Sequence, residues 1–266
     1  MPDVNYFVGI DVGSTVCKAV AINSNDKPTA AEVFTSVMGN PEKAAVSCLK
    51  ELAKKLNVKV RQLKRNSLAT GLNGEKISIK EKESEITCIG KGAYSLNPNI
   101  QIVVDVGSFS MKSIKLDDTG KIADFMMNYR CAAGGGILLE LVGEGLELDI
   151  TELAEIASQS TNPILISSQC SIFAESEVIS HKNEGANLAD LVAGVCNSVA
   201  GRVYPLVRML DKDPKVVAFT GGVAKNKWIV KNLEERLEFE LVKLPIEPEY
   251  IGAYGAALIA KERGGG

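Results

Sequence analysis

Histidine is almost absent from this chain of 266 residues, in which His181 is the only one. A metal site made of several histidines is therefore excluded, and a Ser-His-Asp triad would have to use this one histidine. Basic residues are not in excess either: the net charge is −3 and the lysines and arginines read as scattered, so we expect no nucleic-acid and no membrane partner. No apolar run is long enough for a membrane-spanning helix, and no signal-peptide pattern opens the chain, so we expect a cytoplasmic protein.

The chain also lacks a linker rich in Pro, Gly or Ser, so two lobes in contact are expected rather than separated domains. Apolar residues make up 45% and charged residues 24%, as in a globular protein. Strands and helices alternate, which indicates the α/β class. We expect strands near 6–23, 30–36, 66–70, 102–114, 216–219 and 239–244, and helices from 41 (with Asn40 as cap), near 83–92, 134–144, 151–158, 171–182, 187–209 and 227–237, and a last one carrying Gly252–Ala257.

One frame of residues occurs twice. Asp11-Val12-Gly13-Ser14 is followed by Lys18, and Asp105-Val106-Gly107-Ser108 is followed by Lys112. Each frame lies between two apolar strands, so each predicts a strand-turn-strand unit. Glycine permits a close backbone approach, and consecutive N–H groups at such a turn bind anions. The repetition favours two turns that hold a polyphosphate, with the two aspartates facing a hydrated Mg²⁺.

A third glycine motif follows the buried strand near 216–219. Thr220-Gly221-Gly222 leads into a helix start at Asn226. Bare glycine backbone there would let a flat ring lie against the chain, although a simple helix-entry turn explains the same pattern. The small residues from Gly252 to Ala257 fit close packing of the last helix on another element.

Together these motifs resemble the actin-like ATPase superfamily, which has two phosphate hairpins, a Gly-Gly adenosine turn and a closing helix in this order. The resemblance implies two ribonuclease-H-like lobes with a nucleotide cleft between them: residues 1–97, completed by 248–266, and residues 98–247. It implies that Asp11 and Asp105 are catalytic and hold Mg²⁺ through water. The implied ATP/ADP-binding residues are Gly13, Ser14, Thr15, Lys18, Gly107, Ser108, Gly221, Gly222 and Asn226.

Six cysteines remain to be explained. Four of them (17, 48, 88 and 196) sit in apolar patterns and read as small buried hydrophobic residues. Cys131 and Cys170 instead precede a Gly-rich and a Ser-rich helix start, where the helix dipole stabilises a thiolate. Thiolates bind iron–sulfur clusters, and two per chain would become four in a twofold dimer. Two ordinary buried cysteines are the open alternative.

The cysteine blocks carry a closer resemblance. Asn128-x-x-Cys131-Ala132-Ala133-Gly134 and Ser167-Ser168-x-Cys170-x-x-Phe173-Ala174-Glu175 look like the signatures of the activator ATPases of 2-hydroxyacyl-CoA dehydratases. That group also contains the ATPase subunits of benzoyl-CoA reductase and the reductases of double-cubane cluster proteins. The resemblance implies a homodimer with one shared [4Fe–4S] cluster on Cys131 and Cys170 of each subunit. A ferredoxin- or flavodoxin-like donor would reduce the cluster, and ATP binding and hydrolysis would gate transfer of one electron to an iron–sulfur acceptor enzyme.

The chain departs from the usual activator pattern in three places. Ser108-Phe109-Ser110 stands where Gly-Gln-Asp is usual, Gly135-Gly136-Ile137 follows the first cysteine block, and Gly71-Leu72-Asn73-Gly74 replaces a Gly-Tyr-Gly-Arg turn. These differences favour a sister branch that serves another acceptor. Three alternatives stay open: a small-molecule kinase of the same superfamily, an ATP-binding switch without catalysis, and a dimer bridged by zinc on the same thiolates.

Overall fold

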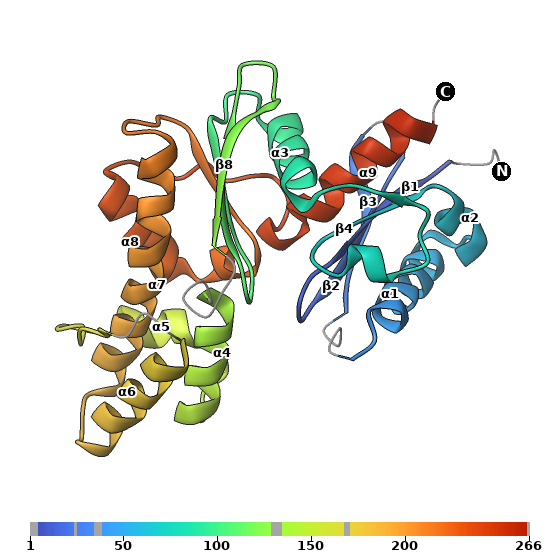
Figure 1. Cartoon of the computed structure of the whole chain (residues 1–266). Helices are drawn as coiled ribbons and strands as arrows, with labels where there is room; N and C mark the ends of the chain where they lie inside the picture. Colours follow the sequence, from blue (N-terminus) through green and yellow to red (C-terminus); the bar gives the residue numbers. More distant parts are fainter. Residues whose placement is uncertain (1–4, 24–25, 35–38, 129–134, 168–170, 265–266) are drawn as a thin grey trace. The chain divides into compact units, whose positions relative to one another are not determined.

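The computed structural model describes residues 5–23, 26–34, 39–128, 135–167 and 171–264 (Figure 1). The chain forms two compact units. Unit 1 contains residues 1–100, 116–122 and 244–266, and unit 2 contains residues 101–115 and 123–243. Within the described residues, no helix combines the length and the apolar character needed to cross a membrane.

Unit 1 is built on a five-stranded sheet in the order β3-β2-β1-β4-β5. The hairpin of β1 and β2 is antiparallel, and β4 runs parallel to β1 on its other side. The strands are β1 (Phe7–Val12), β2 (Cys17–Ile22), β3 (Pro28–Phe34), β4 (Ser67–Thr70) and β5 (Glu81–Lys82).

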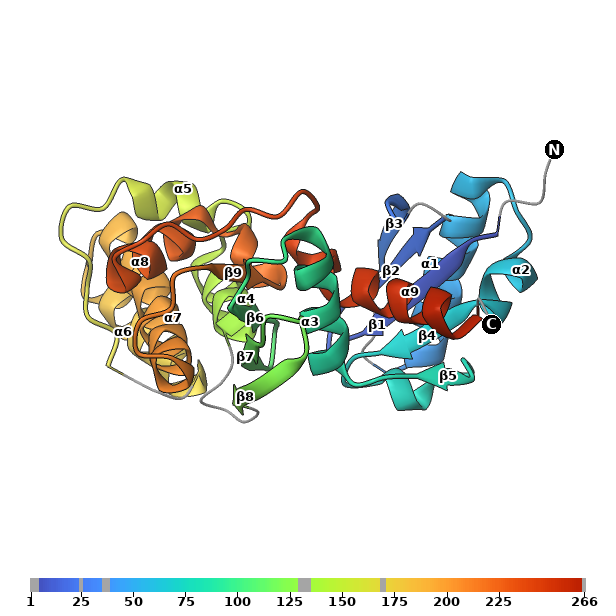
Figure 2. The same cartoon turned by 90° about the horizontal axis from the view of Figure 1, so that it is seen from above.

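Helices cover both faces of this sheet, because apolar residues alternate along its strands. Val8 and Ile10 pack with helix α1 (Pro41–Leu56), whereas Phe7 belongs to the cluster formed with α9 (Ile251–Gly264). Figure 2 shows α9 running along β1 and β4, with α3 (Glu85–Leu96) beside it. The Asn40 side chain caps α1 as the sequence predicts, accepting from the Lys43 N–H at 2.9 Å.

Small residues let α9 approach its neighbours at backbone distance. A Cβ added to Gly255 would lie 1.8 Å from the carbonyl oxygen of Cys88 in α3, and one added to Gly9 would lie 1.8 Å from the carbonyl oxygen of Ala253. The predicted close packing of the last helix is therefore confirmed.

We expect Gly255→Ala to lower the free energy of unfolding by about 3 kcal/mol, because the two helices must separate to admit the methyl group. Thermal unfolding followed by circular dichroism measures this loss. Gly252→Ala, one turn earlier in the same helix, is the matched control, since its Cβ would meet no atom closer than 3.5 Å. Equal melting temperatures for the two variants would contradict this account of the packing.

Unit 2 repeats the strand order of unit 1. Its four-stranded sheet has the order β8-β7-β6-β9, in which β6-β7 is an antiparallel hairpin and β9 is parallel to β6. One apolar cluster joins this sheet to its helices. The elements are β6 (Ile102–Val106), β7 (Met111–Leu116), β8 (Ile122–Asn128), β9 (Val217–Thr220), α4 (Gly135–Leu146), α5 (Leu153–Ser158), α6 (Ser171–Asn183), α7 (Leu188–Leu210) and α8 (Lys227–Leu237).

Several elements differ from the sequence prediction, and three of them bear on the sheets and on the site region. The strand expected near 239–244 is reduced to a single parallel bridge between Ala218 and Val242. Strand β8, which ends at Asn128, was not among the predicted strands. A short helix that was not predicted, α2 (Val60–Arg65), follows α1.

Candidate functional site

The two predicted aspartates occupy equivalent positions in the two sheets. Asp11 faces Lys18 across the hairpin and Thr70 on the parallel strand β4. Asp105 faces Lys112 across its hairpin and Thr220 on the parallel strand β9. The duplication seen in the sequence therefore extends to a third strand in each unit.

Each aspartate is held by its lysine. Lys18 Nζ lies 2.8 Å from Asp11 Oδ2, and Lys112 Nζ lies 3.4 Å from Asp105 Oδ1. The threonines differ between the units. The Thr220 hydroxyl lies 2.9 Å from Asp105 Oδ2 and 3.1 Å from the Val104 carbonyl oxygen, so it can donate to either. In unit 1 the Thr70 hydroxyl is buried and has no hydrogen-bond partner among the described residues.

The turns after the aspartates close in the same way. The N–H of Gly13 donates to the Val16 carbonyl at 3.0 Å, and the N–H of Gly107 donates to the Ser110 carbonyl at 3.0 Å. Asn73 ties down the first turn: its side-chain amide donates to the Gly13 carbonyl at 2.7 Å and its backbone N–H to the Val12 carbonyl at 2.8 Å. These carbonyl oxygens would repel a phosphate, so their engagement inside the chain suits the turn to an anion.

The start of α4 donates hydrogen bonds to the carbonyls of the second turn, as Asn73 does in the first. The N–H groups of Gly136 and Ile137 donate to the carbonyls of Gly107 and Ser108, at 3.1 and 3.0 Å. Only glycine fits this approach, because a Cβ at Gly136 would lie 2.8 Å from the Ser108 Cα. Gly136, the second residue of α4, therefore lets the helix lie directly against the turn.

A glycine with positive φ follows each threonine. Gly71 has φ +87° and Gly221 has φ +84°. A Cβ at Gly71 would lie 2.3 Å from Asp11 Oδ1, and one at Gly221 would lie 2.4 Å from the Val106 carbonyl oxygen. Gly222 is different: it is exposed, and an added Cβ would meet no atom within 4 Å. Gly221 is therefore required by the backbone conformation, whereas the space beside Gly222 is open.

We expect alanine substitutions at Gly221 and Gly222 to have different effects. Gly221→Ala should cost on the order of 3 kcal/mol of folding free energy, because it forces alanine into a glycine-only backbone conformation and into the Val106 carbonyl. Gly222→Ala should leave the melting temperature unchanged but weaken ADP binding about tenfold if adenosine lies against this residue. Calorimetric titration with ADP measures the second effect, and unchanged affinity would remove Gly222 from the adenosine site.

The structure places the other predicted nucleotide residues as follows. Ser14, Thr15 and Ser108 are half-buried in their turns. The Asn226 side chain caps α8, accepting from the N–H groups of Trp228 and Ile229 at 3.1 and 3.0 Å. Its amide also points to the Cys196 sulfur at 3.7 Å. Nucleotide binding by Asn226 stays a prediction.

The predicted cluster ligands, Cys131 and Cys170, lie outside the described residues. The other four cysteines are all buried, as expected. Burial raises the pKa of the thiols of Cys88 and Cys196 to about 12, and the bond with Cys48 together with burial raises that of Cys17. The thiols of Cys17, Cys88 and Cys196 are therefore poor thiolate donors. The described ranges contain no group of three or more His, Cys, Asp or Glu residues that could hold a metal ion.

Sequence reasoning missed several residues of this site: Thr70, Asn73 and Thr220, which contact the turns or their aspartates, and Glu140, which accepts a hydrogen bond from the Ser108 hydroxyl at 3.3 Å. One signal could have found the threonines, since Thr-Gly follows a short buried strand in both halves of the chain. No local signal marks Glu140.

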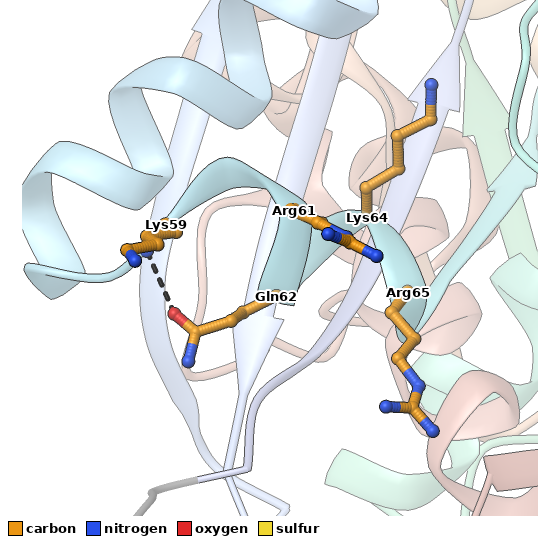
Figure 3. Close-up of a pocket in the computed structure, with 5 residues that line it drawn as sticks. All are labelled: Lys59, Arg61, Gln62, Lys64 and Arg65. Atoms are coloured by element: carbon orange, nitrogen blue, oxygen red, sulfur yellow. Dashed lines mark hydrogen bonds between the residues drawn. The ribbon is translucent and has the colours of Figure 1, made fainter.

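A separate hollow of about 600 Å³ lies at α2, where four cations gather (Figure 3). All of its lining residues are exposed, and Gln62 folds back to accept from the Lys59 N–H at 2.9 Å. The scattering of basic residues expected from the sequence is therefore wrong here. The hollow shares no residue with the turns. Its lining consists of Lys59, Arg61, Gln62, Lys64 and Arg65.

Comparison with known proteins adds independent information. A family model described as the BadF/BadG/BcrA/BcrD ATPase family matches residues 8–260. The activator of lactoyl-CoA dehydratase from Anaerotignum propionicum is 39% identical to the chain, over 97% of the chain and 98% of that protein. The 2-hydroxyisocaproyl-CoA dehydratase activator from Clostridioides difficile is 37% identical, over 96% and 94%.

Comparison with solved structures leads to the same group of proteins. The activator of the 2-hydroxyisocaproyl-CoA dehydratase from Clostridium difficile with bound ADPNP superposes with a TM-score of 0.90 at 34% identity, covering 97% of this chain and 95% of that one. A ROK family glucokinase from Streptomyces griseus shares the fold alone, with a TM-score of 0.60 at 10% identity over 97% and 99% of the two chains. The predicted fold class is confirmed.

Proposed function

Because this chain belongs to the BadF/BadG/BcrA/BcrD ATPase family, we propose that it hydrolyses ATP to drive one-electron reduction of a partner enzyme. The partner we propose is an iron–sulfur enzyme, either a 2-hydroxyacyl-CoA dehydratase or a related double-cubane cluster or benzoyl-CoA reductase-type component. The names of the relatives support the dehydratase, and the sequence departures at the second turn and after Cys131 support a sister acceptor. A ferredoxin- or flavodoxin-like protein is the proposed donor.

The observation that carries the ATPase assignment is the duplicated arrangement of aspartate, lysine, threonine and glycine around two anion-binding turns. In the proposed site, Ser14 and Thr15 and then Ser108 donate backbone N–H groups to phosphate oxygens. Gly13 and Gly107, whose own N–H groups close the turns, line the phosphate and let it approach the backbone. Phosphoryl transfer to water depends on such positioning and charge stabilisation and requires no covalent protein intermediate.

The carboxylates fit a magnesium ion. Asp11 and Asp105 present oxygen donors, which Mg²⁺ prefers, at the strand ends next to the turns. Each already has a lysine beside it, so we propose that they hold the ion through its water ligands rather than directly. The bound ion would neutralise phosphate charge. Lys18 and Lys112 would then keep the carboxylates oriented.

The chemistry of the cysteines fits an iron–sulfur cluster. Cys131 precedes α4, which begins at Gly135, and Cys170 directly precedes Ser171, where α6 begins. A helix N-terminus favours thiolate, in contrast with the buried thiols of Cys88 and Cys196. We propose a homodimer in which both cysteines of each subunit hold one [4Fe–4S] cluster, which would supply a one-electron carrier.

The test is metal analysis and ATP turnover on protein purified without oxygen. We expect about four iron and four acid-labile sulfide per dimer, a brown colour that bleaches with dithionite, and ATP hydrolysis without added sugar. Zinc in place of iron would replace the redox role with a zinc-bridged switch. A colourless protein that phosphorylates a small hydroxyl compound would make it a kinase of the same fold.

A further inference from the structure

A carboxylate that the duplicated frame does not contain lies beside the second turn. The Ser108 hydroxyl lies 3.3 Å from Glu140 Oε1. Glu140 stands four positions after Gly136 in α4, so both residues lie on the helix face that meets the turn. The backbone bonds from Gly136 and Ile137 to the turn fix that face. The position of Glu140 therefore follows from how the helix is seated.

No cation among the described residues balances the charge of this carboxylate. In the part of the chain that the structure describes, Glu140 makes no ion pair, and its one recorded side-chain bond is to Ser108. The Glu140 side chain is exposed, and the part of it that is buried against the turn raises its pKa, against the opposing effect of the Ser108 bond. An unpaired carboxylate next to an anion-binding turn repels the anion. Such a residue lowers the affinity of the turn for an anion, and a role in the reaction would explain why it is there.

The turn itself supplies no other acid or base beyond Asp105. Phe109 is 46% exposed and has no side-chain hydrogen-bonding group. The Ser110 hydroxyl already receives a hydrogen bond from Lys112 Nζ at 2.8 Å. Asp105 is engaged by Lys112 and Thr220. Glu140 is thus the carboxylate at this turn that no basic residue occupies.

We propose that Glu140 holds and deprotonates the water that attacks the γ-phosphate of ATP, an inference that rests on the proposed ATPase activity. The water oxygen bonds to the γ-phosphorus while the bond from that phosphorus to the β–γ bridging oxygen breaks. ADP leaves with the electron pair of that bond. The water proton passes to the Glu140 carboxylate and then to solvent, and Ser108 keeps the carboxylate oriented.

We test this with Glu140→Gln, which keeps the shape of the side chain and removes the base. The expected result is a loss of roughly 10²-fold in kcat for ATP hydrolysis, with a Kd for ADP in calorimetry that is no higher than that of the wild type. In the wild type kcat should fall as the pH drops through the raised pKa of Glu140, because the protonated acid cannot accept a proton. The variant should lack this acidic limb.

Glu144→Gln is the matched control: Glu144 lies one turn further along α4 and is exposed like Glu140, but it does not contact the turn, so the variant should keep the wild-type kcat. Glu140→Asp retains a carboxylate, so part of the activity and the acidic limb should return. A Glu140→Gln variant with normal kcat, or with a loss that resides in ADP affinity, overturns the assignment. Absence of ATP hydrolysis in the wild type would instead overturn the proposed function itself.

Discussion

Cys131→Ser and Cys170→Ser are each expected to give a colourless protein that has lost its iron and no longer reduces an acceptor. Serine offers a hydroxyl where the cluster requires a thiolate. ATP hydrolysis should persist, because neither cysteine belongs to the duplicated turns. Iron and sulfide analysis, the visible spectrum and a phosphate-release assay measure the three quantities on the same anaerobic preparation.

Cys196→Ala is the control for this pair. Its thiol is buried in α7 and burial raises its pKa to about 12, so it should not contribute a thiolate. The alanine variant should stay brown with a full complement of iron. If Cys131→Ser or Cys170→Ser kept normal iron, the ligand assignment would be wrong, whatever the ATPase rate.

Asp11→Asn and Asp105→Asn should do the reverse, lowering kcat for ATP hydrolysis by roughly 10²-fold or more while the iron content stays normal. The amide keeps one oxygen but loses the charge that attracts hydrated Mg²⁺. Raising the Mg²⁺ concentration should recover part of the activity, since the loss is in ion binding. A phosphate-release assay across a magnesium titration shows both effects.

Asp118→Asn removes a carboxylate at the exposed end of the β7-β8 hairpin and should leave the rate unchanged. The two site variants should also differ from each other in stability. Both variants lose the ion pair with their lysine, but only Asp105→Asn keeps an acceptor for the Thr220 hydroxyl, so Asp11→Asn should be the less stable of the two. Wild-type rates in both variants would exclude a magnesium role for these aspartates.

The parts of the site that could be predicted from the sequence are those that neighbouring residues determine. Each Asp-x-Gly-Ser turn lies within one hairpin, so Lys18 and Lys112 were visible a few positions away. Thr70 and Thr220 reach their aspartates only through parallel strand pairing, across 59 and 115 positions of sequence. No local pattern reports such a pairing, because the intervening helices decide which strands become neighbours.

The fold class and the family could also be predicted from the sequence. The family predicted from the cysteine blocks is confirmed, as is the α/β class with two sheets. The strand expected near 239–244 was wrong. Its apolar residues reach β9 only at Val242, whose N–H donates to the Val217 carbonyl at 2.8 Å. Pro245 follows closely and has no N–H with which to extend a ladder.

Glycines at the start of α4 have a mechanical consequence. Gly136 and Ile137 bond directly to the turn carbonyls, with no side chain between helix and turn to absorb a displacement. A short helix moves as a rigid rod, so a shift of the turn on loss of phosphate must drag its first residues along. Cys131 stands only four positions before Gly135. The first residues of α4 would therefore move together with the proposed phosphate turn, and the proposed iron ligand Cys131 is close to them in sequence.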